Sequence, residues 1–339
     1  MYKRLREVNV ADNLGNRVFI TFIIKSVEVR PQKNNKEYMT IIMKDKDTEV
    51  EAKIFDIDSN IKEKVSAGKV YNAAVDVRPY AKGKDGLSCI VYNIDYSDVP
   101  VSEFEDWVDN IEVYYNIINN FIIQVSSSKI GKITYNILAK HWDKFTRWPA
   151  AMNQHHSSMG GLVMHTACIT QACYNEAIMY NKIYGDIIDT NLLICAALLH
   201  DIMKVEELDI TDGNIGYSGD SALETHIISV IKEVSIEASK VNEENSKEVK
   251  ELIHCIAAHH GLLEYGSPIE PHMIEAMILN KQDEIDADIW RYSRKTKALK
   301  AQTYYSEWAS GGIKVYYKSA GDTKEQTDNG QEVDSGASE

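Results

Sequence analysis

The sequence predicts a multidomain chain of α and β structure, in which a small N-terminal β-barrel precedes an all-α helical bundle. Short runs rich in Val, Ile, Phe and Tyr fill residues 17–96 and are separated by turn residues. After Pro100, apolar residues recur every three to four positions, which is typical of helices. All ten histidines lie at or after His141, so we expect the metal or proton chemistry in the helical part.

The barrel prediction depends on five short segments, each bounded by Gly, Asp, Asn, Lys or Pro. We expect strands at 17–29, 38–44, 50–55, 70–78 and 87–96. Five strands in about eighty residues fit a small closed barrel of the OB type. Another five-stranded sheet is the alternative.

The helical period predicts seven helices after Pro100. Their expected ranges are 108–123, 129–145, 161–180, 190–204, 221–238, 246–260 and 271–288, with Pro271 in the first turn of the last. The segment 319–339 is rich in Gly, Asp, Ser and Glu, so we expect a disordered acidic tail. The expected organisation is a barrel domain at 1–100, a helical linker region at 101–148, a catalytic bundle at 149–318 and the tail at 319–339.

The net charge of -14 is distributed unevenly. Residues 1–100 hold 17 Lys and Arg against 15 Asp and Glu, so a basic face on the barrel is compatible with the composition. No apolar run of 18 residues and no signal sequence appear, and the five cysteines form no CxxC pair. We therefore expect a cytoplasmic protein with reduced thiols and no membrane partner.

The strongest chemical signal is the pair His200-Asp201, which follows the apolar run Leu192–Leu199. A carboxylate at such a buried position is costly unless it is paired or binds a metal. Imidazole nitrogen and carboxylate oxygen together suit Mn²⁺, Zn²⁺, Fe²⁺ or Mg²⁺. Lys204 follows three residues later on the same helical face, where its ammonium group could meet a phosphate.

Further candidate ligands are spread over the other predicted helices. They are His165, His226, His259-His260 and Asp283. Any one of these residues alone could be a satisfied structural side chain. Their order along the chain resembles the HD superfamily of metallophosphohydrolases.

The resemblance is closest to the YhaM family, and it runs from about Arg17 to Lys318. It is carried by Pro149-Ala150-Ala151, His155-His156, Gly160-Gly161-Leu162, His165, Leu198-Leu199-His200-Asp201, His259-His260-Gly261, Gly266-Ser267-Pro268 and Asp283. The chain departs from the family pattern at Met203 and at Asn280. The resemblance implies a cytoplasmic 3′-to-5′ exoribonuclease, built from an OB-fold followed by an HD domain.

Residue roles also follow from the resemblance. It implies that His165, His200, Asp201 and Asp283 hold one divalent ion, and that Asp201 bridges to a second ion held by His226 and His259. Mn²⁺ is expected, with Mg²⁺, Fe²⁺, Zn²⁺ and Co²⁺ as alternatives. Asp201, Lys204 and His260 are the expected catalytic residues, with His260 a further ligand or a proton carrier. His155 and His156 are expected to line the substrate entrance or to support the ligands.

The barrel carries aromatic and basic residues that suit single-stranded nucleic acid. The candidates for substrate binding are Tyr38, Lys53, Phe55, Arg78 and Tyr80. The expected partner is single-stranded RNA, with DNA as a second substrate, and the expected products are nucleoside 5′-monophosphates. The resemblance and the aromatic segment Trp308–Tyr317 also predict a homo-oligomer.

Two other functions remain open at this point. One is a phosphodiesterase or phosphohydrolase for small or cyclic nucleotides, because a fold does not determine a substrate. The other is a non-catalytic nucleic-acid-binding assembly module that keeps a metal for stability.

Overall fold

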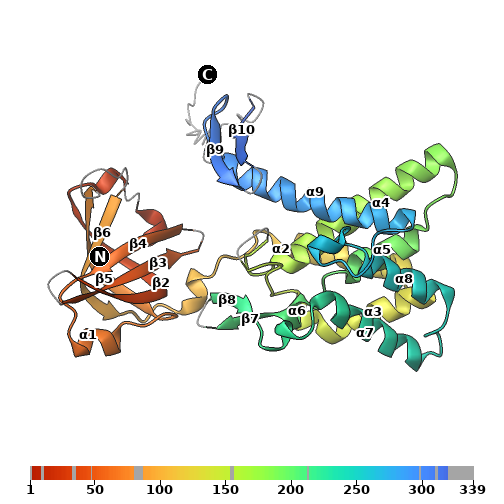
Figure 1. Ribbon diagram of the computed structural model, residues 1–339, viewed down its shortest axis with the longest axis horizontal. Coiled ribbons are helices and arrows are strands. Elements are labelled where there is room, and N and C mark those ends of the chain that lie inside the picture. Colours follow the sequence, from red (N-terminus) through yellow and green to blue (C-terminus); the bar gives the residue numbers. More distant parts are fainter. Residues whose placement is uncertain are drawn as a thin grey trace, which may run out of the picture. The chain divides into compact units, whose positions relative to one another are not determined.

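The computed structural model describes residues 2–319, apart from 9–10, 33–35, 47, 80–86, 153–155, 212–213, 298 and 310–311 (Figure 1). The chain divides into two compact units, Met1–Asp286 and Ala287–Glu339. Two predicted substrate residues, His155 and Tyr80, lie outside the described residues, and so does the predicted tail beyond Ser319.

The N-terminal part is a closed five-stranded barrel. Its strands are β2 (Arg17–Pro31), β3 (Glu37–Asp45), β4 (Thr48–Ile54), β5 (Val70–Pro79) and β6 (Leu87–Tyr96). They pair in the order β2-β3-β4-β6-β5, and β5 pairs back with β2, which closes the ring (Figure 1). Only β4 and β6 run parallel within this ring, and helix α1 (Ser59–Lys64) follows β4. This is the topology of an OB-type barrel, as the sequence predicted.

Alternating side chains build the barrel core. The inward positions of β2 and β3 hold Phe22, Ile24, Ile41 and Met43, all fully buried. These residues meet Val75 and other apolar side chains of the facing strands. The register of β2 against β3 shifts between Ile24 and Ser26, and such a bulge bends a strand, as closure of a small barrel requires. The short strand β1 (Lys3–Arg4) adds a parallel edge to β2.

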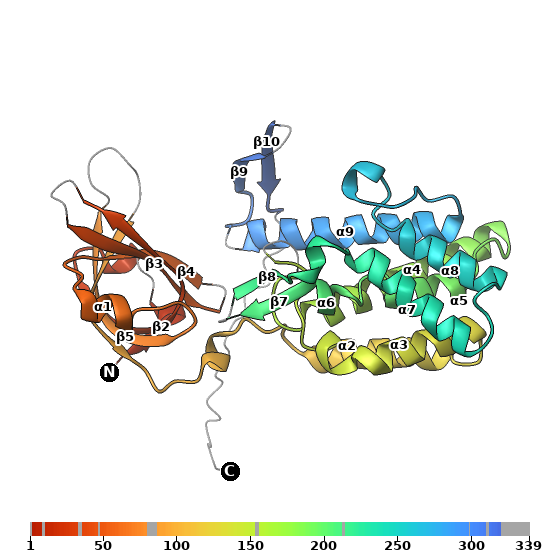
Figure 2. The ribbon, with the colours of Figure 1, turned by 60° about the horizontal axis from the view of Figure 1, so that its bottom comes forward.

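The second part of the first unit is a helical bundle around α5. The helices are α2 (Ile111–Val125), α3 (Lys129–Phe145), α4 (Gly161–Tyr184), α5 (Thr190–Leu199), α6 (Lys204–Glu207), α7 (His226–Lys240), α8 (Lys247–Ala257) and α9 (Ile274–Lys297). Every residue of Leu192–Leu199 is buried, because α5 packs against α3, α4 and α8 (Figure 2). A helix that is apolar on all sides needs such a central position.

Several helix boundaries differ from the predicted ones; α9, for example, ends at Lys297 and not at residue 288. The predicted helix 190–204 ends at Leu199, and a turn at 200–203 separates it from α6. The predicted helix 221–238 begins only at His226, because 208–217 form a hairpin of β7 (Leu208–Thr211) and β8 (Asn214–Tyr217). Helix α9 begins at Ile274, so Pro271 precedes it instead of forming its first turn. Among the described residues, no helix is long and apolar enough to cross a bilayer.

Candidate metal centre

The predicted ligands converge on the carboxylate of Asp201, which is 2% exposed. Its Oδ2 atom lies 3.2 Å from Nε2 of His165 on α4, 3.5 Å from Nε2 of His200 and 2.6 Å from Nζ of Lys204. Nε2 of His165 also lies 3.3 Å from Oδ1 of Asp283 on α9 and 3.3 Å from Nε2 of His200. Two helices, α4 and α9, and the turn after α5 therefore bring together the four residues expected to share one ion.

The other oxygen of the same carboxylate faces two further imidazoles. Oδ1 of Asp201 lies 3.2 Å from Nε2 of His226 at the start of α7, and 3.6 Å from Nε2 of His259 after α8. The ring of His260 lies beside both, with centroids 5.4 Å from His226 and 4.3 Å from His259. Asp201 therefore stands between two histidine groups, with one oxygen facing each.

Four imidazoles face Asp201, and each of them is hydrogen-bonded through its Nδ1 atom to an oxygen on its far side. The acceptor is the carbonyl of Ala197 for His200 at 2.8 Å, that of Ile256 for His259 at 2.7 Å, the carboxylate of Glu207 for His226 at 2.8 Å and the carboxylate of Asp286 for His165 at 2.8 Å. An oxygen acceptor requires the proton on Nδ1. When such a ring is neutral, its Nε2 lone pair faces Asp201, and this is the tautomer that binds a metal.

Three buried atoms in this cluster fit a metal better than they fit the protein around them. Among the described side chains, Oδ1 of Asp201 and the Nε2 atoms of His226 and His259 are buried without a hydrogen-bond partner. Unsatisfied buried polar atoms are costly, and a cation bound between these three atoms would satisfy all of them. One donor atom each from His165, His200 and Asp201 lies within 4.8 Å of the others, and the same holds for His226, His259 and His260. The residues present therefore fit divalent ions.

Burial and charge give the cluster opposing pKa shifts. Burial lowers the pKa of His200 to about 3, so its ring is neutral at pH 7. Burial also opposes the charged form of His165, but the carboxylates of Asp201, Asp283 and Asp286 outweigh it and raise its pKa. Burial would raise the pKa of Asp201, yet Lys204 and the neighbouring histidines hold it well below its usual range. Asp201 is therefore a carboxylate at neutral pH, as a ligand must be.

Local backbone geometry explains two glycine motifs around the site. Gly161 begins α4 four residues before His165, and a Cβ there would lie 2.0 Å from the carbonyl oxygen of His156. Gly261 has φ +77°, and a Cβ there would lie 2.6 Å from the Asn280 amide nitrogen. That amide donates a 2.8 Å hydrogen bond to the carbonyl of His259. Asn280, which departs from the family pattern, therefore positions a predicted ligand.

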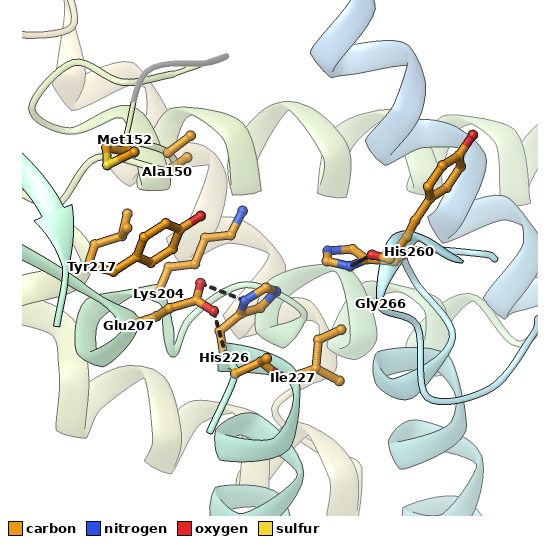
Figure 3. A pocket seen from close by; sticks show the side chains of 13 residues that line it. Ala150, Met152, Lys204, Glu207, Tyr217, His226, Ile227, His260 and Gly266 are labelled. Carbon is orange, nitrogen blue, oxygen red and sulfur yellow. Dashed lines mark hydrogen bonds and ion pairs between the residues drawn. The ribbon is translucent and has the colours of Figure 1, made fainter. Parts of the chain in front are cut away.

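A cavity of about 500 Å³ opens beside the histidine cluster. Lys204, His226 and His260 face it, with Tyr217 and Tyr265 on its wall (Figure 3). Burial, together with neighbouring His259, lowers the pKa of His260 to about 4. The site is thus open on the side of the predicted catalytic Lys204 and His260.

Sequence reasoning missed two carboxylates that hold predicted ligands in place. Oδ2 of Asp286 on α9 contacts both Nδ1 of His165 at 2.8 Å and Nε2 of His156 at 2.7 Å. Glu207 contacts both Nδ1 and the backbone N–H of His226. The available signals were the spacing of three from Asp283 to Asp286 and from Lys204 to Glu207, which puts each pair on one helical face.

The described barrel candidates fall into two groups. The rings of Tyr38 on β3 and Phe55, just after β4, stack with centroids 5.5 Å apart, and Nζ of Lys53 lies 5.9 Å from the Tyr38 centroid. Arg78 on β5 instead contacts Asp76 at 3.1 Å, and its guanidinium lies 3.4 Å from the Tyr92 hydroxyl. The first group forms an aromatic and basic surface on β3 and β4, whereas Arg78 belongs to an ion-pair cluster.

Comparisons with known proteins found one family match and several similar solved structures. Residues 170–288 match the HD domain family. The mitochondrial single-stranded DNA-binding protein Rim1 from S. cerevisiae is 17% identical over 24% of this chain and 94% of its own, with a TM-score of 0.22. The second OB-fold domain of replication protein A from Methanococcus maripaludis is 15% identical over 30% of this chain and 98% of its own, with a TM-score of 0.21.

The HD match and the barrel topology give the chain an OB plus HD architecture. The barrel assignment rests on its own strand order and closure. The HD match covers all the predicted ligands except His165, which lies five residues before it. An HD domain indicates a metal-dependent phosphohydrolase.

Proposed function

We propose that this chain is a metal-dependent phosphodiesterase that hydrolyses single-stranded RNA from its 3′ end, with DNA as a second substrate. The observation that carries the proposal is that four imidazole Nε2 atoms face the two carboxylate oxygens of Asp201. Each ring is fixed through Nδ1, so the arrangement is organised before any ligand binds.

The ligand sets follow from which Asp201 oxygen each ring faces. We assign His165, His200, Asp201 and Asp283 to one divalent ion, preferably Mn²⁺. The second ion would be held by Asp201, His226 and His259, with His260 as a further ligand or as a proton carrier. Two such ions supply Lewis acidity, which lowers the pKa of a bound water and neutralises charge on the phosphate oxygens.

The protein's own groups complete the site. Lys204 is nearly buried beside Asp201, so its ammonium group would meet a substrate phosphate in a region with little competing water. Nδ1 of His260 donates to the carbonyl of Tyr265 at 3.1 Å, which leaves Nε2 available as an acceptor. We assign to Lys204 the stabilisation of negative charge on the phosphate, and to His156 the support of Asp286.

The barrel supports a polymeric substrate. OB-type barrels bind oligonucleotides on the face that here corresponds to β3 and β4, and that face carries the Tyr38, Phe55 and Lys53 group. Aromatic rings stack bases without sequence preference, and a nearby cation follows the backbone. This surface favours RNA over a free mononucleotide as the substrate.

The decisive experiment is digestion of 5′-labelled single-stranded RNA with Mn²⁺ by the native chain and by Asp201→Asn. We expect a descending ladder from the native chain and an intact strand from the variant. Asp209→Asn is the matched control, because Asp209 is exposed on β7 and its loss should leave the ladder unchanged.

Other outcomes separate the competing functions. An intact strand together with Mn²⁺-dependent turnover of a cyclic dinucleotide would favour the small-nucleotide phosphodiesterase. Strand binding without release of mononucleotides under any divalent ion would favour the assembly module. Hydrolysis by Asp201→Asn at the native rate would exclude the proposed centre.

A further inference from the structure

The second compact unit differs from the rest of the chain in charge. Residues 287–319 contain seven Lys and Arg against two Asp and Glu, within a chain of net charge -14. The same stretch holds seven Trp and Tyr residues. In the structure it comprises the C-terminal part of α9 and a hairpin of β9 (Tyr304–Ala309) and β10 (Gly312–Tyr317) (Figure 1).

One face of this hairpin is fixed to α9. Tyr316 is 1% exposed, and its ring meets that of Tyr292 with centroids 4.9 Å apart. Glu307 forms a 2.6 Å ion pair with Lys295 and accepts a hydrogen bond from the Tyr316 hydroxyl at 3.1 Å. These contacts hold an otherwise marginal two-stranded hairpin in a defined position.

The opposite face of the hairpin is an exposed apolar surface. Strand alternation and the cross-strand pairs Ile313–Trp308 and Tyr317–Tyr304 put four side chains on one side, with Val315 between them. Their exposed fractions are 82% for Trp308, 67% for Tyr304, 60% for Ile313, 59% for Tyr317 and 53% for Val315. Contiguous apolar surface of this kind marks a binding site.

Exposed lysines precede this hairpin in the chain, and a further one, on β10, lies on the hairpin face opposite the exposed rings. Lys297, Lys300 and Lys314 are exposed, and within the described part of the chain none of them has an ion-pair partner. Two copies meeting through the same surface would bring these like charges together, since a twofold contact pairs identical patches. A polyanion would be attracted instead.

We propose that this surface, formed by Tyr304, Trp308, Tyr317 and the neighbouring lysines, is a second binding site for single-stranded nucleic acid. Bases stack on the exposed rings, and phosphates interact with Lys297 and Lys300, the exposed lysines that precede the hairpin in the chain. The site needs no metal and no hydrolysis, so it stands independently of the proposed catalytic centre.

The test is fluorescence anisotropy of a 5′-labelled 20-nucleotide oligouridylate with the full chain in EDTA, so that no hydrolysis competes. Trp308→Ala should raise Kd about tenfold, the effect of losing one stacked base, and Trp308→Phe should restore most of the affinity. Lys300→Glu should raise Kd and flatten its dependence on salt. The matched controls are Tyr135→Ala on α3, which is 54% exposed, and Lys247→Glu on α8.

Trp308 is mostly exposed, so its loss should not unfold the chain, and circular dichroism checks this. Native affinity in both Trp308→Ala and Lys300→Glu would overturn the proposal. Sedimentation of the same variants tests the competing occupant: an oligomer that Trp308→Ala dissociates would assign this face to a second copy and overturn the proposal. If the native chain hydrolyses RNA and both variants keep the native affinity, only this second binding site is rejected. If the native chain binds RNA without hydrolysing it and the variants lose affinity, only the catalytic proposal is rejected.

Discussion

At the scale of single residues, the site depends on which nitrogen of each histidine is held. Two of the four acceptors are backbone carbonyls three residues earlier in the chain, at Ala197 and Ile256. The other two are carboxylates that come from distant positions, Glu207 and Asp286. Two of the four supporting contacts are therefore local in the sequence, whereas the other two form only in the tertiary fold.

Asp286 differs from the other three acceptors because its carboxylate contacts two histidines, His165 and His156. Asp286→Ala should weaken Mn²⁺ binding and lower the rate of RNA hydrolysis by about 10- to 100-fold, since His165 loses its fixed orientation. Isothermal titration with Mn²⁺ measures the affinity. Asp288→Ala, two residues further along α9 at an exposed position, should leave Mn²⁺ binding unchanged. Native Mn²⁺ affinity in Asp286→Ala would show that the carboxylate does not position His165.

Gly261 allows the chain to turn directly after His259-His260. Gly261→Ala should destabilise the protein by more than about 1–2 kcal/mol, because a positive φ is unfavourable for Ala and the added Cβ collides with Asn280. Urea unfolding measures the change. Gly266→Ala is the control, since Gly266 has φ +86° in the left-handed helical region and open space around its Cβ position. Equal losses in the two variants would rule out a role for the Asn280 contact.

At the scale of elements, the end of α5 determines where the predicted catalytic residues lie. The helix is apolar throughout, and it stops at Leu199 so that His200 and Asp201 occupy a turn instead of a further helical turn. The turn still brings Lys204 to 2.6 Å from Asp201. The contact expected from helical spacing therefore exists, although a different backbone produces it.

The paired strands β3 and β4 present the aromatic surface of the barrel. Phe55→Ala should weaken binding of a labelled oligouridylate about tenfold, because it removes one stacking ring and leaves Tyr38 without its partner. Anisotropy measures the change. Phe19→Ala on β2 is a control of similar exposure, 51% against 38%. A weaker complex in the control and not in Phe55→Ala would move the strand-binding surface to β2.

At the scale of the whole molecule, the centre connects helices that lie far apart in the sequence. Its predicted ligands come from α4, the turn after α5, α7, the turn after α8 and α9. Binding there must stabilise the bundle, because an ion that binds only the folded chain shifts the folding equilibrium.

Removal of metal should therefore lower the thermal stability of the bundle. At a metal concentration about 100 times Kd the stabilisation is about 2.7 kcal/mol, or roughly 5–10 °C in Tm for a domain of this size. Differential scanning calorimetry with Mn²⁺ and with EDTA measures the difference. It should vanish in Asp201→Asn and persist in Asp209→Asn, and a Tm that does not respond to Mn²⁺ in the native chain would argue against a metal centre.

The positions of the five barrel strands and of most helices were determined by the sequence alone. Alternation of period two and apolar spacing of three to four are local properties, and they survive because each matches a face that must be buried. The choice of His165, His200, Asp201, His226, His259 and Asp283 as candidates came from residue types and their order. Their roles as ligands stay a prediction that the metal-binding experiments address.

Only the tertiary structure decided what lies behind and beside these residues. Nothing in the local pattern distinguishes Asp286 from the neighbouring acids of α9, because its contact with His165 spans 121 positions. The same is true of the hairpin that ends α9: its sequence shows many aromatics, but strand pairing decides that Tyr316 is buried while Trp308 faces solvent. Contacts between distant segments depend on how whole elements pack, and a local pattern does not carry that information.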